Sequence, residues 1–279
     1  MNFKNFLRKK LARYLNNSAY SRSFFTLYGV AFKEIRLSFR QFFSWKRPIT
    51  TLFRTLAIIF SALVRLLLGR NLKYSFAYTG EDRILEGIYK PLITENGYYV
   101  DVGCNHPKFL SNTYGLYRKG WRGICVDANP IVIQKFDYLR PRDIAVSALV
   151  SDELGEKNFY TIENNVLSTV EIENLRDAEK QGLSYQTSKL QTRTLTSILD
   201  ENDCPSEIGI LSVDVEEHDF NVLKSLDFQK YSPKLIIVED ETYQVDFPEN
   251  NLIYSFLKDQ GYDLIGFVLT NLYFLRKGR

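Results

Sequence analysis

The sequence predicts an α/β fold, in which a mostly parallel sheet is covered by helices and preceded by a basic helical extension. From about residue 73 onward, nearly continuous apolar strands alternate with helical segments, which is the pattern of a parallel sheet buried on both faces. Before residue 73 the chain is basic and lacks this alternation. We therefore expect two parts: an extension, residues 1–72, and a single α/β domain, residues 73–279.

The expected elements of the domain alternate from its first helix to its last strand. The expected strands are 97–102, 122–127, 143–150, 157–161, 189–193, 208–213, 235–238, 262–269 and 272–276. The expected helices are 82–90, 111–119, 130–139, 195–200, 218–226 and 250–259. A turn at Thr270 and Asn271 makes the last strand antiparallel. The polar stretch up to about residue 188 is expected to form a loop or a mobile cover.

Charge separates the extension from the domain. Residues 1–70 contain 14 Lys or Arg and one acid, Glu34, whereas the remainder contains 22 basic and 32 acidic residues. Residues 49–68 are long enough to cross a bilayer, but Arg54 and Arg65 share one side of the helix. This favours a helix lying on a membrane surface. A helix packed within the protein and a true membrane span are the alternatives.

The remaining bulk features point to an intracellular setting. In the extension, the apolar residues of 3–15 and 23–43 have helical spacing. We do not expect nucleic acid as a partner, because the extension contains no motif that reads a nucleic-acid groove. The three cysteines have no metal-binding spacing, and no signal peptide opens the chain. We expect a cytoplasmic protein, peripheral at the inner face of the membrane through residues 1–70.

The most informative local motif is YYVDVGCN, residues 98–105, in which a strand reaches Asp101 and turns at Gly103. The next strand ends in Asp127, and an acid at that position can accept both hydroxyls of a ribose. The further glycines that a pyrophosphate requires are absent, because Asn105 and His106 follow. This pattern disfavours a dehydrogenase. It favours a cofactor with ribose and adenine but no phosphate, namely S-adenosylmethionine (SAM).

Four predicted strands end in acids at the edge where an open α/β sheet binds its ligand: Asp101, Asp127, Asp214 and Glu239. Helix capping can explain one or two of them. Four together, without Lys or Arg, favour a cationic or hydroxyl-rich ligand and would repel the phosphates of NAD or ATP. A divalent metal bound by Asp214, Glu216, His218 and Glu239 is possible but not favoured.

Several blocks of the sequence resemble the FkbM family of SAM-dependent methyltransferases. They are residues 98–105, 121–130 (WRGICVDANP), 211–227 (LSVDVEEHDFNVLKSLD) and 234–239 (KLIIVE), with Gly80-Glu81-Asp82 upstream. The resemblance covers residues 73–277. It implies a seven-stranded Rossmann-like class I methyltransferase sheet and O-methylation of a hydroxyl, which we expect to belong to a sugar, glycan or glycolipid.

The resemblance also implies roles for single residues. Asp101, Gly103 and Asn105 would hold the methionine part of SAM. Asp127 would bind the ribose with Asn129 beside it, and the segment 150–152, including Asp152, would lie near the adenine. Asp214 would lie next to the reacting methyl group.

Two histidines, His218 and His106, are candidates for the base that deprotonates the acceptor. His218 is the first choice because Asp214 and Glu216 precede it closely, and His106, in the loop after Gly103, is the second. The chain departs from the family at Glu217, where a glycine is usual. This departure leaves room for an alternative function, a non-catalytic membrane-associated adaptor with a degenerate methyltransferase fold.

Overall fold

The computed structural model describes residues 75–89, 97–162 and 184–278, with scattered helical positions between residues 49 and 64. The chain divides into two compact units, Met1–Tyr74 and Ser75–Arg279. The expected helices 3–15 and 23–43 lie outside the described residues, as does most of the expected polar insertion. In the described part of the chain, no helix is both long and apolar enough to cross a membrane.

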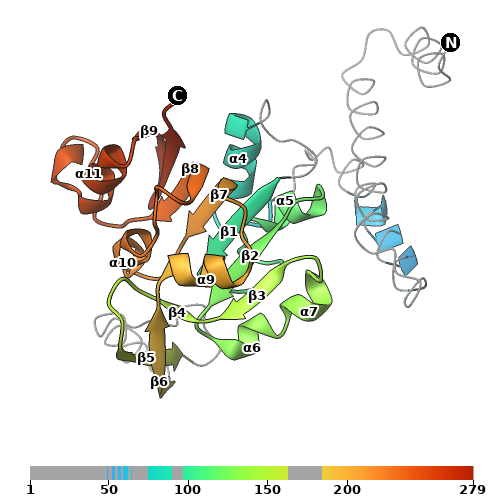
Figure 1. Ribbon diagram of the computed structural model, residues 1–279. Coiled ribbons are helices and arrows are strands. Elements are labelled where there is room, and N and C mark those ends of the chain that lie inside the picture. Colours follow the sequence, from blue (N-terminus) through green and yellow to red (C-terminus); the bar gives the residue numbers. More distant parts are fainter. Residues whose placement is uncertain are drawn as a thin grey trace, which may run out of the picture. The chain divides into compact units, whose positions relative to one another are not determined.

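A seven-stranded sheet with the order β3-β2-β1-β7-β8-β10-β9 forms the centre of the second unit (Figure 1). Neighbouring strands from β3 to β8 are parallel, whereas β10 is antiparallel to both β8 and β9. The prediction of a mostly parallel sheet with an antiparallel last strand is confirmed. The strands are β1 (Tyr98–Val102), β2 (Arg122–Asp127), β3 (Ile144–Ser147), β7 (Glu207–Val213), β8 (Ser232–Glu239), β9 (Tyr262–Val268) and β10 (Asn271–Arg276).

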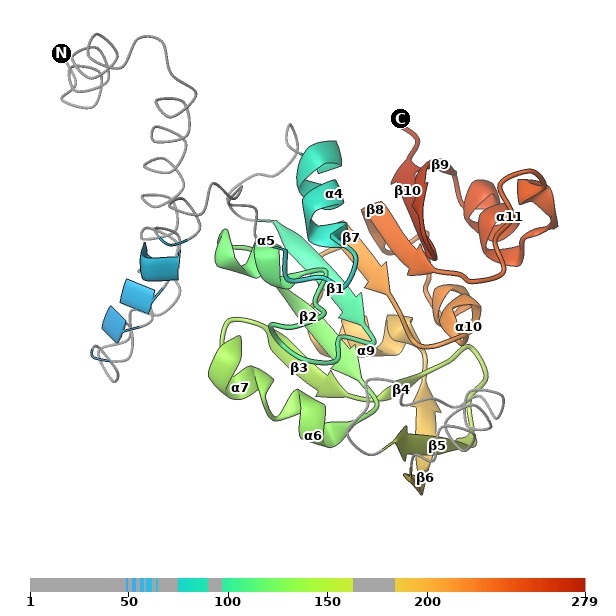
Figure 2. The ribbon, with the colours of Figure 1, turned by 180° about the vertical axis from the view of Figure 1, so that it is seen from behind.

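Helices cover both faces of this sheet, as the two opposite views show (Figures 1 and 2). Buried residues such as Val100 and Leu211 pack with α9 (Leu195–Glu201), α10 (Asp219–Lys224) and α11 (Leu252–Asp259). Their strand neighbours Tyr99 and Ile210 pack on the other face with α4 (Glu81–Tyr89), α5 (Tyr114–Arg118) and α7 (Phe136–Leu139). Alternate side chains of each strand therefore fill two separate cores.

Two expected elements are each divided in the structure. The strand expected at 143–150 is β3 followed by β4 (Leu149–Val150), which pairs with β6 (Tyr185–Arg193) in a second sheet of order β4-β6-β5. Its third member is β5 (Glu156–Ile162), and β6 includes the end of the expected insertion. The helix expected at 130–139 is divided into α6 (Pro130–Ile133) and α7, with an interruption at residues 134–135. A short 3-10 helix, η1 (Pro248–Asn250), precedes α11.

Candidate active site

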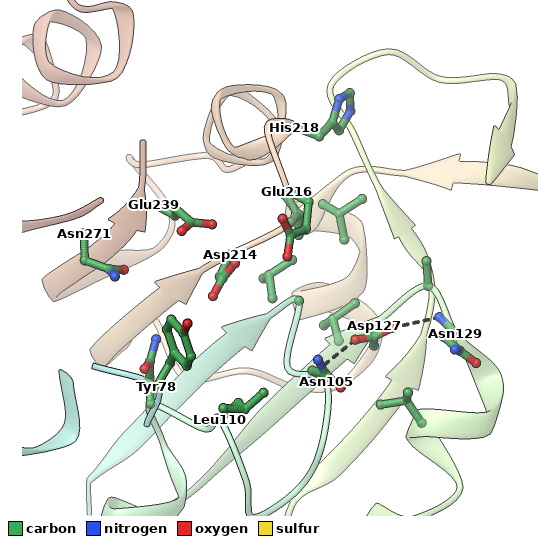
Figure 3. A pocket seen from close by; sticks show the side chains of 18 of the residues that line it. Tyr78, Asn105, Leu110, Asp127, Asn129, Asp214, Glu216, His218, Glu239 and Asn271 are labelled. Atoms are coloured by element: carbon green, nitrogen blue, oxygen red, sulfur yellow. Dashed lines mark hydrogen bonds between the residues drawn. The ribbon is translucent and has the colours of Figure 1, made fainter. Parts of the chain in front are cut away.

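A cavity of about 570 Å³ opens at the carboxyl ends of the central strands, where the residues after β1, β2, β7 and β8 converge. Figure 3 shows two groups of side chains in it. Asn105, Asp127 and Asn129 lie on one side. On the other lie Asn271 and three acids, Asp214, Glu216 and Glu239, which we call the acid end.

Gly103 makes the tight turn after β1 at φ +77°, a conformation that favours glycine. The amide nitrogens of Gly103 and Cys104 both donate to the carbonyl oxygen of Val126, at 2.9 and 3.1 Å. A Cβ added to Gly103 would lie 1.7 Å from the carbonyl oxygen of Asp214. The glycine thus allows the backbones after β1 and β7 to approach each other at the floor of the cavity.

Asp127, at the tip of β2, organises the first side of the cavity. Its carboxylate accepts hydrogen bonds from the amide nitrogens of Asn105, at 3.0 Å, and Asn129, at 2.8 Å. Asn129 in turn caps α6 by accepting from the amide nitrogen of Ile131 at 3.0 Å. Burial raises the pKa of Asp127, while the two amide donors oppose the rise. The carboxylate is thereby fixed with its unoccupied lone pairs available to a ligand in the cavity.

The acid end brings three carboxyl groups together, and burial and their mutual repulsion raise the pKa of Asp214 and of Glu216. Burial, followed by the charge of Glu239, raises the pKa of Asp214 well above its usual range. This shift favours the protonated form of Asp214, which interacts with Glu239 through a side-chain hydrogen bond. Glu239 also accepts from Thr270 Oγ1 at 2.9 Å. Burial and the charge of Glu239 raise the pKa of Glu216 to about 7. Glu216 can therefore exchange a proton near neutral pH.

A further part of the cavity wall comes from both ends of the second unit, and the sequence did not predict it. Tyr78, Thr79 and Glu81 precede or begin α4, and Leu269, Thr270 and Asn271 form the β9–β10 turn. Asn271 Nδ2 donates to Glu81 Oε1. Leu110 and Asn112, from the loop after Gly103, complete this part of the lining. The only sequence signals were the Gly80-Glu81-Asp82 block and the expected hairpin turn.

Seven of the ten residues predicted for the site line the cavity: Gly103, Asn105, Asp127, Asn129, Asp214, Glu216 and His218. Asp101 does not, because strand alternation turns it, with Tyr99, toward the α5 and α7 face. Asp101 is buried and accepts a 2.5 Å hydrogen bond from Thr113 Oγ1. Thr113 Oγ1 also accepts from Arg140, so Asp101 belongs to a buried polar network.

The core of this network is the ion pair between Arg140 Nε and Asp143 Oδ2, 2.6 Å apart, with both side chains fully buried. The Arg140 guanidinium also donates to the hydroxyls of Tyr99, at 2.8 Å, and Ser111, at 3.3 Å. Ser111 and Thr113 flank Asn112, whose Nδ2 donates to Ser212 Oγ at 3.1 Å. The network therefore anchors the end of the loop that supplies Asn112 to the cavity.

Two other predicted residues, His106 and Asp152, also lie outside the lining. His106 Nδ1 accepts from the amide nitrogens of Lys108 and Phe109, at 3.1 and 3.2 Å, and so orders its own loop. Asp152 forms a 2.6 Å ion pair with Lys224 and accepts from Asn221 at 2.8 Å. These contacts attach the segment after β4 to α10.

His218 lines the cavity but lies apart from the acid end (Figure 3). It is buried, and its Nε2 lies 3.1 Å from Ser151 Oγ. The preceding residues, Glu216 and Glu217, both have positive φ, at 56° and 74°. Glu217 thus occupies a left-handed conformation that glycine adopts with less strain.

In the described part of the chain, no group of three or more His, Cys, Asp or Glu side chains is placed to hold a metal ion. The four residues considered for a metal, Asp214, Glu216, His218 and Glu239, all line the cavity, yet His218 lies apart from the three acids (Figure 3).

The strand order β3-β2-β1-β7-β8-β10-β9, with β10 antiparallel and a cavity over the first glycine turn, defines a Rossmann-like methyltransferase fold. Residues 101–264 match the methyltransferase FkbM domain. The chain belongs to this methyltransferase family.

Comparison with solved structures gives distant similarities. A TehB-like SAM-dependent methyltransferase from Corynebacterium glutamicum is 9% identical with a TM-score of 0.38, covering 79% of this chain and 97% of that one. An O-methyltransferase from Bacillus cereus, in complex with SAH, is 10% identical with a TM-score of 0.36, covering 77% and 90%. No curated protein matches the chain.

Proposed function

We propose that this protein is an O-methyltransferase that transfers the methyl group of SAM to a hydroxyl of a sugar, glycan or glycolipid. The observation that carries the proposal is the cavity itself, which places the fixed carboxylate of Asp127 and the acid end on opposite sides of one space. Among the residues that the structure describes, neither Lys nor Arg lines this space. Such a lining suits a phosphate-free cofactor with a sulfonium cation.

The residues of the cavity fit this cofactor. The lone pairs of Asp127 that its two amide donors leave unoccupied can accept ribose hydroxyls. The apolar side chains of Val132 and Val150 can pack against the adenine, and Gly103 and Asn105 can contact the methionine part. When bound, SAM supplies an activated methyl group. The protein's own part is to align the acceptor oxygen and to remove its proton.

We further propose Glu216 as the group that accepts this proton. A base is most effective when its pKa lies near the working pH, and the pKa of Glu216 is raised to about 7. Asp214 is less suitable because burial and the charge of Glu239 raise its pKa well above its usual range, which favours its protonated form. His218, the first candidate from the sequence, has its Nε2 within hydrogen-bonding distance of Ser151 and lies apart from the acid end.

Calorimetric titration of the full chain with S-adenosylhomocysteine (SAH) tests the cofactor assignment. We expect micromolar binding that falls at least about tenfold in Asp127→Ala, because the ribose hydroxyls lose their acceptor. Asp137→Ala, at an exposed position on α7, is the matched control and should bind SAH as the unsubstituted chain does. If the folded chain fails to bind SAH, this result would contradict the methyltransferase proposal and favour the alternative, a non-catalytic membrane-associated adaptor.

We also propose that the first unit attaches the protein to an anionic membrane surface at the cytoplasmic side. Large apolar side chains at helical spacing are exposed there: Ile49, Leu52, Phe53, Leu56, Phe60 and Val64. The excess of basic residues in positions 1–70 supplies attraction to anionic headgroups.

Co-sedimentation of the full chain with vesicles tests the membrane assignment. We expect binding to vesicles with anionic lipid, weaker binding to zwitterionic ones, and a loss in the double variant Phe53→Asn/Phe60→Asn. Phe109→Asn, an exposed aromatic of the second unit, is the control. Equal sedimentation of the double variant and this control would contradict the proposal.

A further inference from the structure

Three large apolar side chains that line the cavity are also exposed to solvent. They are Tyr78, 82% exposed, Leu110, 42% exposed, and Leu269, 65% exposed. They come from three separate segments: the residues before α4, the loop before α5 and the β9–β10 turn. We call these three residues the apolar rim. Convergence of three segments on one opening is unlike the single exposed apolar residues that are normal on a protein surface.

Two leucines of the rim have a backbone conformation that is unfavourable for this residue type. Leu110 and Leu269 both have φ of 56°, in the left-handed region where Gly and Asn are the usual residues. Burial in the core does not offset this strain, because both leucine side chains are exposed. The backbone geometry therefore does not explain the choice of leucine at these positions, whereas contact with an apolar group in the cavity does.

The polar part of the same cavity has the opposite character. The acid end and Glu81 supply carboxyl groups, and Asn271 and Thr270 supply an amide and a hydroxyl. Lys and Arg are absent from the lining in the described part of the chain. Hydroxyls can donate to these oxygens, whereas a phosphate, sulfate or carboxylate would be repelled.

We propose that the acceptor is amphipathic and carries no anionic group: a neutral or basic sugar or polyol with an alkyl or acyl substituent next to the hydroxyl that is methylated. The sugar or polyol faces the acid end, and the substituent packs against the apolar rim. This inference rests on the proposed function, since it concerns the acceptor half of the same cavity.

Binding of paired glycosides to the full chain saturated with SAH tests the inference. The probes are hexyl and methyl glycosides of glucose, galactose and glucosamine, with hexyl glucuronide as the anionic member. Each buried methylene strengthens binding by roughly fourfold, so at least one hexyl glycoside should bind about tenfold or more tightly than its methyl partner. Hexyl glucuronide should bind at least about tenfold more weakly than hexyl glucoside.

Variants of the rim separate this contact from general hydrophobic binding. The double variant Leu110→Asn/Leu269→Asn removes both apolar side chains and introduces a residue that tolerates positive φ, so we expect the variant to fold. It should bind SAH as the unsubstituted chain does and lose most of the preference for hexyl glycosides. Leu154→Asn, at an exposed leucine outside the cavity lining, should retain the preference.

The inference is overturned if each hexyl glycoside binds no better than its methyl partner, or if neither binds to the SAH-loaded chain. It is also overturned if hexyl glucuronide binds as tightly as hexyl glucoside, or if the double variant keeps the hexyl preference. A folded chain that does not bind SAH would instead contradict the proposed function, so the two failures are distinguishable.

Discussion

Asn271 Nδ2 donates a 3.2 Å hydrogen bond to Glu81 Oε1, joining the first residue of β10 to the first residue of α4 across 190 positions of sequence. Both side chains are buried, at 9% and 2% exposure. The backbone nitrogen of Thr79 also donates to Glu81, at 3.0 Å. One carboxyl group thus holds together two segments of the cavity wall.

Removing the amide of Asn271 should destabilise the protein measurably. Asn271→Ala leaves the buried Glu81 without one of its donors, which costs about 1–3 kcal/mol of the free energy of unfolding. Urea denaturation followed by circular dichroism measures this change. Asn158→Ala, at an exposed position on β5, should change the free energy by less than about 0.5 kcal/mol. Similar values for the two variants would show that the Glu81 contact contributes nothing.

Gly103 should tolerate no side chain. In Gly103→Ala the new Cβ would lie 1.7 Å from the Asp214 carbonyl oxygen, so the ends of β1 and β7 must separate. We expect a loss of about 3 kcal/mol or more and a loss of SAH binding. Gly87→Ala on α4 meets nothing within 4 Å and should instead stabilise the protein by up to about 1 kcal/mol. Thermal unfolding of both variants measures the contrast, and equal melting temperatures would contradict it.

Glu217 offers a test of backbone strain that is independent of its side-chain contacts. Glu217→Gly and Glu217→Ala lose the same side-chain contacts, but only glycine adopts φ of 74° without strain. We therefore expect Glu217→Gly to be more stable than Glu217→Ala by about 1 kcal/mol. Denaturant melts of the two purified variants give this difference directly. A more stable alanine variant would mean that the turn relaxes to another conformation.

Stability should fall as the pH rises from 6.5 to 8. Burial raises the pKa of Asp219 to about 8 in the folded protein, whereas the unfolded chain releases this proton near pH 4. Between these values the folded state binds more protons than the unfolded state, so each rise in pH favours unfolding. The raised pKa of Glu216 acts in the same direction up to about pH 7.

Melting temperatures at several pH values test this dependence and its origin. Asp219→Asn keeps an oxygen that can accept from the amide nitrogen of Val215, and it should flatten the dependence. Asp200→Asn is the control, because a hydrogen bond from Lys230 lowers the pKa of Asp200 and moves its titration further from the range tested. Its slope between pH 6.5 and 8 should match that of the unsubstituted chain. If the melting temperature of Asp219→Asn depends on pH as strongly as that of the unsubstituted chain, Asp219 does not cause the pH dependence.

The sequence was sufficient for features that depend on one strand and the turn after it. The apolar runs predicted the sheet, and the motifs around Gly103, Asp127 and Asp214 predicted the edge of the sheet at which the cavity opens. Asp101 was misplaced because a strand pattern does not reveal which face its last residues join. Only the contacts with Thr113 and, through it, Arg140 identify that face.

The remaining part of the cavity could not be predicted because it is formed by contacts between distant segments. Tyr78, Glu81 and Asn271 carry no local motif that distinguishes a cavity wall from a helix start or a strand start. Leu110 and Leu269 are also hidden in the sequence, since nothing near them predicts a positive φ for leucine. Their positions follow from the packing of the whole unit.

The place of β10 between β8 and β9 has a consequence for the order of assembly. β10 is synthesised after both of its neighbours, yet it separates them in the finished sheet. Until it is inserted, β9 has no partner in the sheet, and the cavity lacks Asn271 and its hydrogen bond to Glu81. A nascent or truncated chain that ends before β10 would therefore have an incomplete cavity, although its glycine turn and Asp127 are already present.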